Sequence, residues 1–294
     1  MYDGAAAGKT GAVITTDALT SNGYQLDPVR WGELAPVPRA ERSDREALWQ
    51  RLRRDGYLYL PGMLDREQVL RFRRYYFAAL GATGLTDDPE VGHDSGAQVD
   101  RRILRSALFG TVVPGAEYAS FCTQPALWQW FEWMYDDEVF LHKRRILRHT
   151  RPGEMGIGTA TQAHYDLVYL REGTDRLLSA WIPLGDIPIE RGPLVYLEGT
   201  HIDYTGAEQR GETMPAASMT ADLPSLAERL DRRWLGTDFR AGDVMIHSPY
   251  IVHASLDNVD PDGILRLSTD IRYQRQSDPI DWRWQNYWHD RDGL

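Results

Sequence analysis

A series of short apolar segments separated by turns fills the chain from Glu138 onward, and this spacing constrains the fold more than any other feature. Many short strands at modest spacing are typical of a β-sandwich or barrel. We therefore predict a mainly β fold whose core, over residues 138–275, is a double-stranded β-helix, or jelly roll. The segments expected to form its strands are residues 140–147, 163–170, 177–184, 194–197, 244–247, 251–254 and 265–273.

Helical patterns dominate the preceding residues 27–137. We expect helices over residues 43–54, with Ser43 as N-cap, over 65–80 and over 118–135. Residues 57–60 alternate as a strand, residues 82–100 have the composition of a loop, and a short helix is expected over 220–230. These N-terminal helices are predicted to pack on the β core as a cover, so that residues 27–294 form a single domain.

The two ends of the chain differ in composition. Residues 1–26 are small and polar without periodicity and are predicted to form a flexible leader. Within them, Gly8-Lys9-Thr10 is no phosphate-binding loop, because Asp3 stands where that motif needs its first glycine. The segment 276–294 is rich in Trp and Tyr. We interpret it as a closing segment that packs down, and the alternative is a wall or lid over a pocket.

Composition excludes several classes of function. The chain has 294 residues, 42% of them hydrophobic, which is enough for a sizeable core. Its net charge of -10 argues against nucleic acid and weakly favours a neutral or cationic substrate, although a local basic pocket could reverse that preference. Cys122 is the only cysteine, and the sequence contains neither a membrane-length apolar run nor a signal segment. A reduced, cytoplasmic location is therefore predicted.

Three residues carry the candidate chemistry, namely His164, Asp166 and His253. On a strand, side chains at i and i+2 point to the same face, so His164 and Asp166 can both reach one metal while Tyr165 points away. Two imidazoles and one carboxylate form the facial triad of non-haem Fe(II) oxygenases. His247 competes with His253 for the third position on spacing alone.

Four blocks of sequence, in the same order, resemble the phytanoyl-CoA dioxygenase-like branch of the Fe(II)/2-oxoglutarate oxygenases. The blocks are the H-x-D segment at 164–166, residues 180–188 (AWIPLGDIP), residues 190–201 (ERGPLVYLEGTH), and residues 242–258 followed by 266–268. In that family the last ligand is followed by a small residue and soon after by Asn. The resemblance therefore implies His253 as the ligand and leaves His247 in a second shell or in packing.

The resemblance also implies Fe(II), 2-oxoglutarate as cosubstrate, and O2. It implies that Arg266, thirteen residues after His253, pairs with the distal carboxylate of 2-oxoglutarate, aided by Ser268 on the same strand face. Arg272 is the less favoured alternative. For the 1-carboxylate end, three residues are candidates by location, namely Gln162, Arg148 and Trp181. His201 is expected to be structural, and the four remaining histidines (His93, His142, His149 and His289) to lie at the surface or in second shells.

These observations predict an oxygenase that oxidises a small molecule, by hydroxylation or oxidative ring closure, and releases succinate and CO2. Retention of Asp166 argues against halogenation, since the related halogenases lack this carboxylate. We expect a secondary-metabolite or sugar-containing substrate, and a monomer or homodimer. Two alternatives remain, a cupin-type metal oxygenase that does not use 2-oxoglutarate and a catalytically silent jelly-roll binding protein. Arg266 distinguishes the first alternative from the predicted oxygenase, because an enzyme that does not use 2-oxoglutarate has no need for this residue. The intact triad argues against the second alternative.

Overall fold

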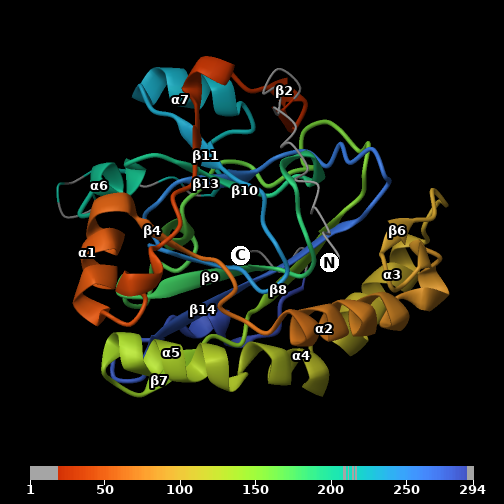
Figure 1. The fold of residues 1–294 in the computed structure, drawn as a ribbon, viewed down its shortest axis with the longest axis horizontal. Coiled ribbons are helices and arrows are strands. Elements are labelled where there is room, and N and C mark those ends of the chain that lie inside the picture. Colours follow the sequence, from red (N-terminus) through yellow and green to blue (C-terminus); the bar gives the residue numbers. More distant parts are fainter. Residues whose placement is uncertain (1–18, 208–209, 211, 214, 216, 290–294) are drawn as a thin grey trace, which may run out of the picture.

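Two β-sheets form the centre of the protein (Figure 1). The structure is a computed structural model that describes residues 19–207, 210, 212–213, 215 and 217–289. The larger sheet has the strand order β4 (Tyr57–Leu60), β12 (Val244–His247), β9 (Leu178–Pro183), β14 (Arg266–Arg275) and β7 (Val139–Leu141), with β8 (Ile146–Thr150) also paired to β14. The smaller sheet has the order β13 (His253–Ser255), β10 (Leu194–Leu197), β11 (Trp234–Gly236) and β3 (Trp31–Glu33).

A buried apolar cluster joins the two sheets. It includes Tyr59 and Met245 from the larger sheet and Tyr196 and Leu235 from the smaller one. Strand alternation decides which side chains enter it, because neighbouring residues point to opposite faces. On β9, Trp181 faces the smaller sheet while Ala180 and Ile182 belong to the core on the other face.

Helices cover the outer face of the larger sheet (Figure 1). They are α1 (Arg45–Asp55), α2 (Arg66–Ala79), α4 (Ala116–Cys122) and α5 (Pro125–Tyr135). Phe131 of α5 stacks on Tyr273 of β14 with ring centroids 4.1 Å apart, which fastens this layer to the sheet. On the opposite side of the molecule, α7 (Leu223–Leu230) packs Leu226 against the smaller sheet. These helices pack on the two sheets, and the N-terminal part also contributes β3 and β4 to them.

Several element boundaries differ from the sequence prediction. The helix expected over 118–135 is two helices, because Pro125 lacks a backbone N–H and begins a new helix at its first position. Asp44, not Ser43, caps α1 by accepting from the Ala47 N–H at 3.1 Å. The strand expected over 140–147 is β7 and the start of β8. The strands and α-helices that were not predicted are β1 (Thr20–Ser21), β2 (Tyr24–Gln25), β3, β5 (Thr86–Asp88), β6 (His93–Asp94), α3 (Arg101–Ala107), α6 (Thr200–Tyr204) and β11.

Residues 19–26, predicted as part of a flexible leader, are anchored on the β core. Leu19 and Leu26 are buried. The Asp257 carboxylate accepts hydrogen bonds from the Asn22 and Gly23 backbone N–H groups, each at 2.9 Å. The leader prediction was wrong for these residues, since two buried leucines and a distant carboxylate outweigh the polar local composition. Residues 1–18, including Gly8-Lys9-Thr10, lie outside the described part of the chain.

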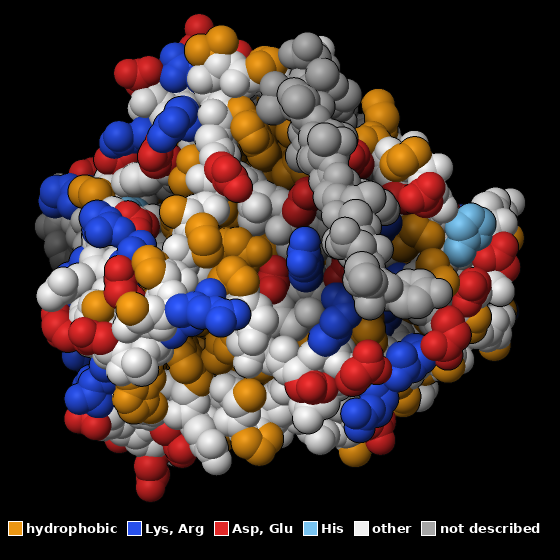
Figure 2. Space-filling model, viewed as in Figure 1, with side chains coloured by type: hydrophobic (Ala, Val, Ile, Leu, Met, Phe, Trp, Pro, Cys, Tyr) orange, Lys and Arg blue, Asp and Glu red, His pale blue; other side chains and the backbone are white. Residues whose placement is uncertain are grey.

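Acidic and basic side chains are interspersed over the face shown in Figure 2 rather than gathered by sign. Such a distribution offers no continuous basic track on that face for a phosphate backbone. Among the described residues, none of the helices has the length and apolar character required to cross a bilayer.

Candidate metal centre

The three predicted ligand residues converge between the sheets. One ligand atom from each of His164, Asp166 and His253 lies within 4.8 Å of the others. The Asp166 Oδ1 atom is 3.8 Å from the His164 Nε2 atom and 3.9 Å from the His253 Nε2 atom. All three side chains are buried or nearly so. This is a compact set of two nitrogens and one oxygen on one side of a potential ion, as a facial triad requires.

The segment that carries His164 and Asp166 is not the strand that was predicted over residues 163–170. His164 forms a two-way backbone bridge with His253, with N···O distances of 3.1 and 2.9 Å. After this bridge the described residues show no further strand pairing in this segment, and Asp166–Val168 forms a 3-10 turn. Tyr165 itself is extended, so the alternation of side chains still holds, and its ring stacks on Tyr204 away from the site. For this reason the side chains of His164 and Asp166 still point to the same side of the segment.

Backbone carbonyls fix both imidazoles in the same tautomer. The His164 Nδ1–H donates to the Gln162 carbonyl at 2.9 Å, and the His253 Nδ1–H donates to the Ile251 carbonyl at 3.0 Å. Both Nε2 atoms are thereby left as acceptors facing Asp166, which is the arrangement that metal-binding histidines adopt. Burial lowers the pKa of each imidazole, so both are neutral and able to donate a lone pair.

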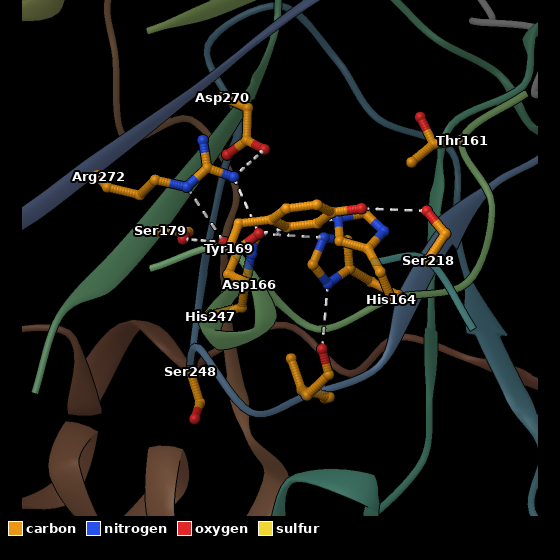
Figure 3. Close-up of polar contacts among 12 residues, drawn as sticks. Thr161, His164, Asp166, Tyr169, Ser179, Ser218, His247, Ser248, Asp270 and Arg272 are labelled. Atoms are coloured by element: carbon orange, nitrogen blue, oxygen red, sulfur yellow. Dashed lines mark hydrogen bonds and ion pairs between the residues drawn. The ribbon is translucent and has the colours of Figure 1, made fainter. Parts of the chain in front are cut away.

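A network behind Asp166 holds its carboxylate ionised (Figure 3). The Arg272 Nη2 atom donates to Asp166 Oδ1 at 2.9 Å and to Asp270 Oδ2 at 2.8 Å, and Arg272 Nε donates to Asp166 Oδ2 at 3.3 Å. The Ser179 hydroxyl also donates to Asp166 Oδ2. Burial alone would raise the pKa of Asp166, but Arg272 and His247 outweigh it and keep the pKa well below its usual range.

His247 contacts the triad from behind rather than completing it. Its Nε2 atom is 3.4 Å from Asp166 Oδ2, and its Nδ1 atom is 3.1 Å from the Tyr196 hydroxyl. A second set, Asp166, His247 and Asp270, also brings ligand atoms within 4.8 Å. The guanidinium of Arg272 already lies between those two carboxylates, so a cation is present there without a metal.

Arg266 has the surroundings expected of a residue that binds an anion. It is 1% exposed, and its Nη1 donates to the Ser268 hydroxyl at 3.2 Å. The Nε and Nη2 atoms are buried without a hydrogen-bond partner. Burial and the nearby charge of Arg148 lower the pKa of Arg266 to about 9. A buried guanidinium in this state is costly unless an anion pairs with it, and a carboxylate matches its geometry.

One cavity of about 320 Å³ connects these groups. All eight residues singled out in the sequence line it, namely Arg148, Gln162, His164, Asp166, Trp181, His253, Arg266 and Ser268. Strand alternation accounts for the β14 wall, where four residues at i, i+2, i+4 and i+6 face inward, namely Arg266, Ser268, Asp270 and Arg272. Sequence reasoning stopped this series at Ser268, missed Asp270 and Ser179, and weighed Arg272 only as an alternative partner for 2-oxoglutarate.

The aromatic C-terminal segment combines its two predicted roles. Trp284 is buried and packs with Leu170 and Leu177, as a closing segment would. Trp284 and Trp288 also line the cavity, together with Tyr169, whose hydroxyl is 3.1 Å from that of Ser218. Aromatic rings therefore form part of the cavity wall, and residues 290–294 lie outside the described chain.

The remaining histidines lie away from the cavity lining. His201 is buried, and its Nε2 atom is 3.1 Å from the Arg53 carbonyl, in keeping with a structural role. His142 is also fully buried, between Gln274 and Gln285, where the sequence suggested the surface or a second shell.

Residues 52–263 match the family model described as "Phytanoyl-CoA dioxygenase (PhyH)". The chain belongs to the phytanoyl-CoA dioxygenase family. This match covers more than half of the sequence, and it confirms the resemblance found in the four sequence blocks. Family membership and the described triad also confirm the predicted cofactors, Fe(II), 2-oxoglutarate and O2. The protein is thus of the non-haem iron, 2-oxoglutarate-dependent oxygenase kind.

Proteins named for an activity are similar to this chain over most of its length. A 1-deoxypentalenic acid 11-beta-hydroxylase from Streptomyces arenae is 27% identical over 246 residues, covering 80% of this chain and 82% of the relative. Two solved structures from nogalamycin biosynthesis share the fold. The carbocyclase SnoK has a TM-score of 0.57 and 19% identity, covering 84% of this chain and 89% of its own. The epimerase SnoN, in complex with Fe3+, alpha ketoglutarate and nogalamycin RO, has a TM-score of 0.55 and 20% identity, covering 80% and 85%. These likenesses confirm the predicted jelly-roll class of the β core.

Proposed function

We propose that this protein oxidises a C–H bond of a small secondary metabolite, by hydroxylation or oxidative ring closure, with conversion of 2-oxoglutarate to succinate and CO2. The observation that carries the proposal is the shared cavity of the triad and Arg266, whose buried guanidinium has two nitrogens without a partner. A cupin-type oxygenase without 2-oxoglutarate has no use for such a group. We also propose that the protein acts in the cytoplasm as a monomer or homodimer.

Each residue of the site has a proposed task. His164, Asp166 and His253 would hold the iron, and Arg266 with Ser268 would hold the distal carboxylate of 2-oxoglutarate. Gln162, Arg148 and Trp181, which line the same cavity, are the candidates for the 1-carboxylate end. When bound, iron with 2-oxoglutarate and O2 supplies the oxidant that removes hydrogen from the substrate. The protein keeps Asp166 ionised through Arg272 and keeps both imidazoles neutral through burial and the carbonyls of Gln162 and Ile251.

The names of similar proteins support a small-molecule substrate but differ in reaction. One acts on 1-deoxypentalenic acid as a hydroxylase, and others are named as an epimerase and a carbocyclase of nogalamycin biosynthesis. The triad is compatible with each reaction, because the product formed after hydrogen removal depends on the position of the substrate's C–H bond and not on the ligand set. Hydroxylation and ring closure therefore both stay within the proposal.

A direct test is anaerobic titration of the protein with Fe(II) and 2-oxoglutarate. We expect a visible metal-to-ligand charge-transfer band that requires both components and that disappears in His164→Ala and Asp166→Ala. His93→Ala is the matched control, since the side chain of this histidine is 45% exposed and its imidazole pairs with Asp87, outside the cavity lining. A folded wild-type protein without the band would refute the proposal.

The role of Arg266 is tested separately by Arg266→Gln. Hydrogen bonds to charged groups are worth about 1.5–3 kcal/mol, so we expect the Kd for 2-oxoglutarate to rise about 10- to 150-fold while Fe(II) binding persists. Arg71→Gln, on the exposed surface of α2, should leave the Kd unchanged. An unchanged Kd in Arg266→Gln, with activity retained, would favour the cupin-type alternative.

A further inference from the structure

A short 3-10 helix in the aromatic C-terminal segment, Trp282–Gln285, contacts the surroundings of Asp166 at two points. One point is the guanidinium of Arg272, which donates to both oxygens of the Asp166 carboxylate. The other is the backbone of Tyr169, whose N–H donates to the Asp166 carbonyl at 3.0 Å and closes the turn that begins at Asp166. The helix supplies none of the three ligand residues, yet both of its contacts lie one step from Asp166.

The first contact is between the Trp284 ring and the guanidinium of Arg272. The Arg272 Cζ atom lies over the ring, 5.0 Å from its centroid. Both side chains are buried, and a desolvated cation over an indole face is held more strongly than an exposed one. The Nη1 atom of Arg272 has no hydrogen-bond partner in the described part of the chain, so the ring adds a constraint that hydrogen bonds leave out. Because Arg272 contacts both oxygens of Asp166, the orientation of its guanidinium fixes that of the carboxylate.

The second contact acts through the main chain. The Tyr169 carbonyl accepts hydrogen bonds from Arg283 Nη2 at 2.9 Å and from Trp284 Nε1 at 3.2 Å. The Tyr169 ring lies across the site beside His164, with ring centroids 5.6 Å apart (Figure 3). A binding site must be held within about 0.5 Å of its working geometry. A fixed carbonyl three residues after Asp166 therefore limits the movement of this residue relative to His164.

The C-terminal 3-10 helix is itself fixed on the core. Asp281 caps it by accepting from the Arg283 N–H at 3.1 Å, and the same carboxylate accepts from the Glu172 N–H at 3.2 Å. The Arg144 N–H donates to the Trp284 carbonyl at 3.0 Å. Asp281 and Trp284 are 1% and 3% exposed, respectively. A helix anchored in this way can hold the residues it contacts rather than follow their movements.

We propose that Trp284 and Arg283 are positioning residues of the metal centre. Trp284 orients the Asp166 carboxylate through Arg272, and Trp284 and Arg283 together hold the turn that begins at Asp166 through the Tyr169 carbonyl. The C-terminal segment thus serves iron binding in addition to forming a wall of the cavity. This inference rests on the proposed function, because it assumes that Asp166 is an iron ligand.

The test is anaerobic titration with Fe(II) at saturating 2-oxoglutarate, followed by the charge-transfer band. Trp284→Leu removes the ring and the Nε1 donor, and we expect the Kd for Fe(II) to rise about 10-fold, the lower end of the range for a group that orients a ligand. Trp284→Phe keeps a ring over Arg272 and should have a smaller effect. Combined with Arg283→Met, it removes both donors to the Tyr169 carbonyl and should again reach about 10-fold.

Two control variants separate positioning from a general loss of stability. Trp282→Leu changes the neighbouring tryptophan of the same helix, which is 71% exposed and outside the cavity lining, and should leave the Kd for Fe(II) unchanged. Leu177→Ala removes buried volume from the apolar cluster that contains Trp284, so it should lower the free energy of unfolding without raising this Kd. In an Arg272→Lys background, Trp284→Leu should raise the Kd by a smaller factor than in wild type, since part of its effect passes through Arg272.

The outcomes distinguish this inference from the proposed function. Absence of the charge-transfer band in wild-type protein refutes the metal centre itself. With the band present, an unchanged Kd for Fe(II) in Trp284→Leu, shown to be folded by circular dichroism, refutes the positioning role. An equal rise of the Kd in Leu177→Ala refutes it as well, because the effect would then follow stability alone. If Trp284→Leu does not fold, the double variant Trp284→Phe with Arg283→Met decides in its place.

Discussion

Replacing His253 with alanine is expected to abolish iron binding, whereas replacing His247 with glutamine is not. The two histidines are neighbours, with ring centroids 4.7 Å apart, and both approach Asp166. His253 directs Nε2 toward the same Asp166 oxygen as His164, and its Nδ1 is engaged by a backbone carbonyl. His247 approaches the other oxygen of Asp166 and is held by Tyr196. We therefore expect His253, and not His247, to act as the third ligand beside His164 and Asp166.

The expected losses of iron affinity differ enough between the two variants to show which histidine is the ligand. Loss of a group that orients a ligand costs roughly 10- to 100-fold in metal affinity or activity, and loss of a ligand costs more. In anaerobic Fe(II) titrations with 2-oxoglutarate, His253→Ala should give no charge-transfer band at any accessible iron concentration. His247→Gln should give the band at a higher iron concentration. Circular dichroism of the metal-free variants controls for folding. The opposite pattern, with the band lost only in His247→Gln, would assign the ligand to His247.

The convergence of His164, Asp166 and His253 was predictable because it depends on local patterns that tolerate errors in secondary structure. Residues 163–170 do not form the expected strand, yet an extended Tyr165 is sufficient to direct His164 and Asp166 to one side. Strand alternation likewise placed Arg266 and Ser268 on one face. The same rule, extended by four residues, reaches Asp270 and Arg272. The apolar neighbours of Arg266, namely Ile264, Leu265 and Leu267, were the signal in the sequence that this strand is buried.

The parts that sequence reasoning missed depend on contacts between distant segments. Ser179 reaches Asp166 because β9 pairs with both β12 and β14. The sequence of a single strand does not determine the register of these pairings. Residues 19–26 are held by Asp257, more than two hundred residues away. Strands of two or three residues, such as β3 and β11, are too short to show an alternation of their own, and they persist because they pair with each other. The cavity wall has the same origin, since Arg148 of β8 and Arg266 of β14 come together only after these strands pair.

Replacing Arg272 with methionine is expected to destabilise the metal-free protein strongly. Arg272 is 2% exposed and is the cation between Asp166 and Asp270, whose charges are otherwise buried close together. Breaking a buried ion pair by removing one partner costs about 3–5 kcal/mol, because it leaves uncompensated charge. The free energy of unfolding, from urea denaturation at pH 7, should fall by about that amount. Adding Asp270→Asn should recover part of the loss, because it removes one of the two unpaired carboxylates.

Arg266→Met provides a matched control for this effect. Arg266 is on the same face of β14, six residues earlier, and is 1% exposed. Among the described residues, its hydrogen-bond partner is the Ser268 hydroxyl and no carboxylate pairs with it. Removal of an unpaired buried guanidinium relieves a desolvation penalty, so this substitution should leave the metal-free protein as stable as wild type or more stable. Equal losses of stability in the two variants would show that both arginines serve packing. That result would contradict the view that Arg272 holds the iron ligand Asp166 whereas Arg266 binds an anion.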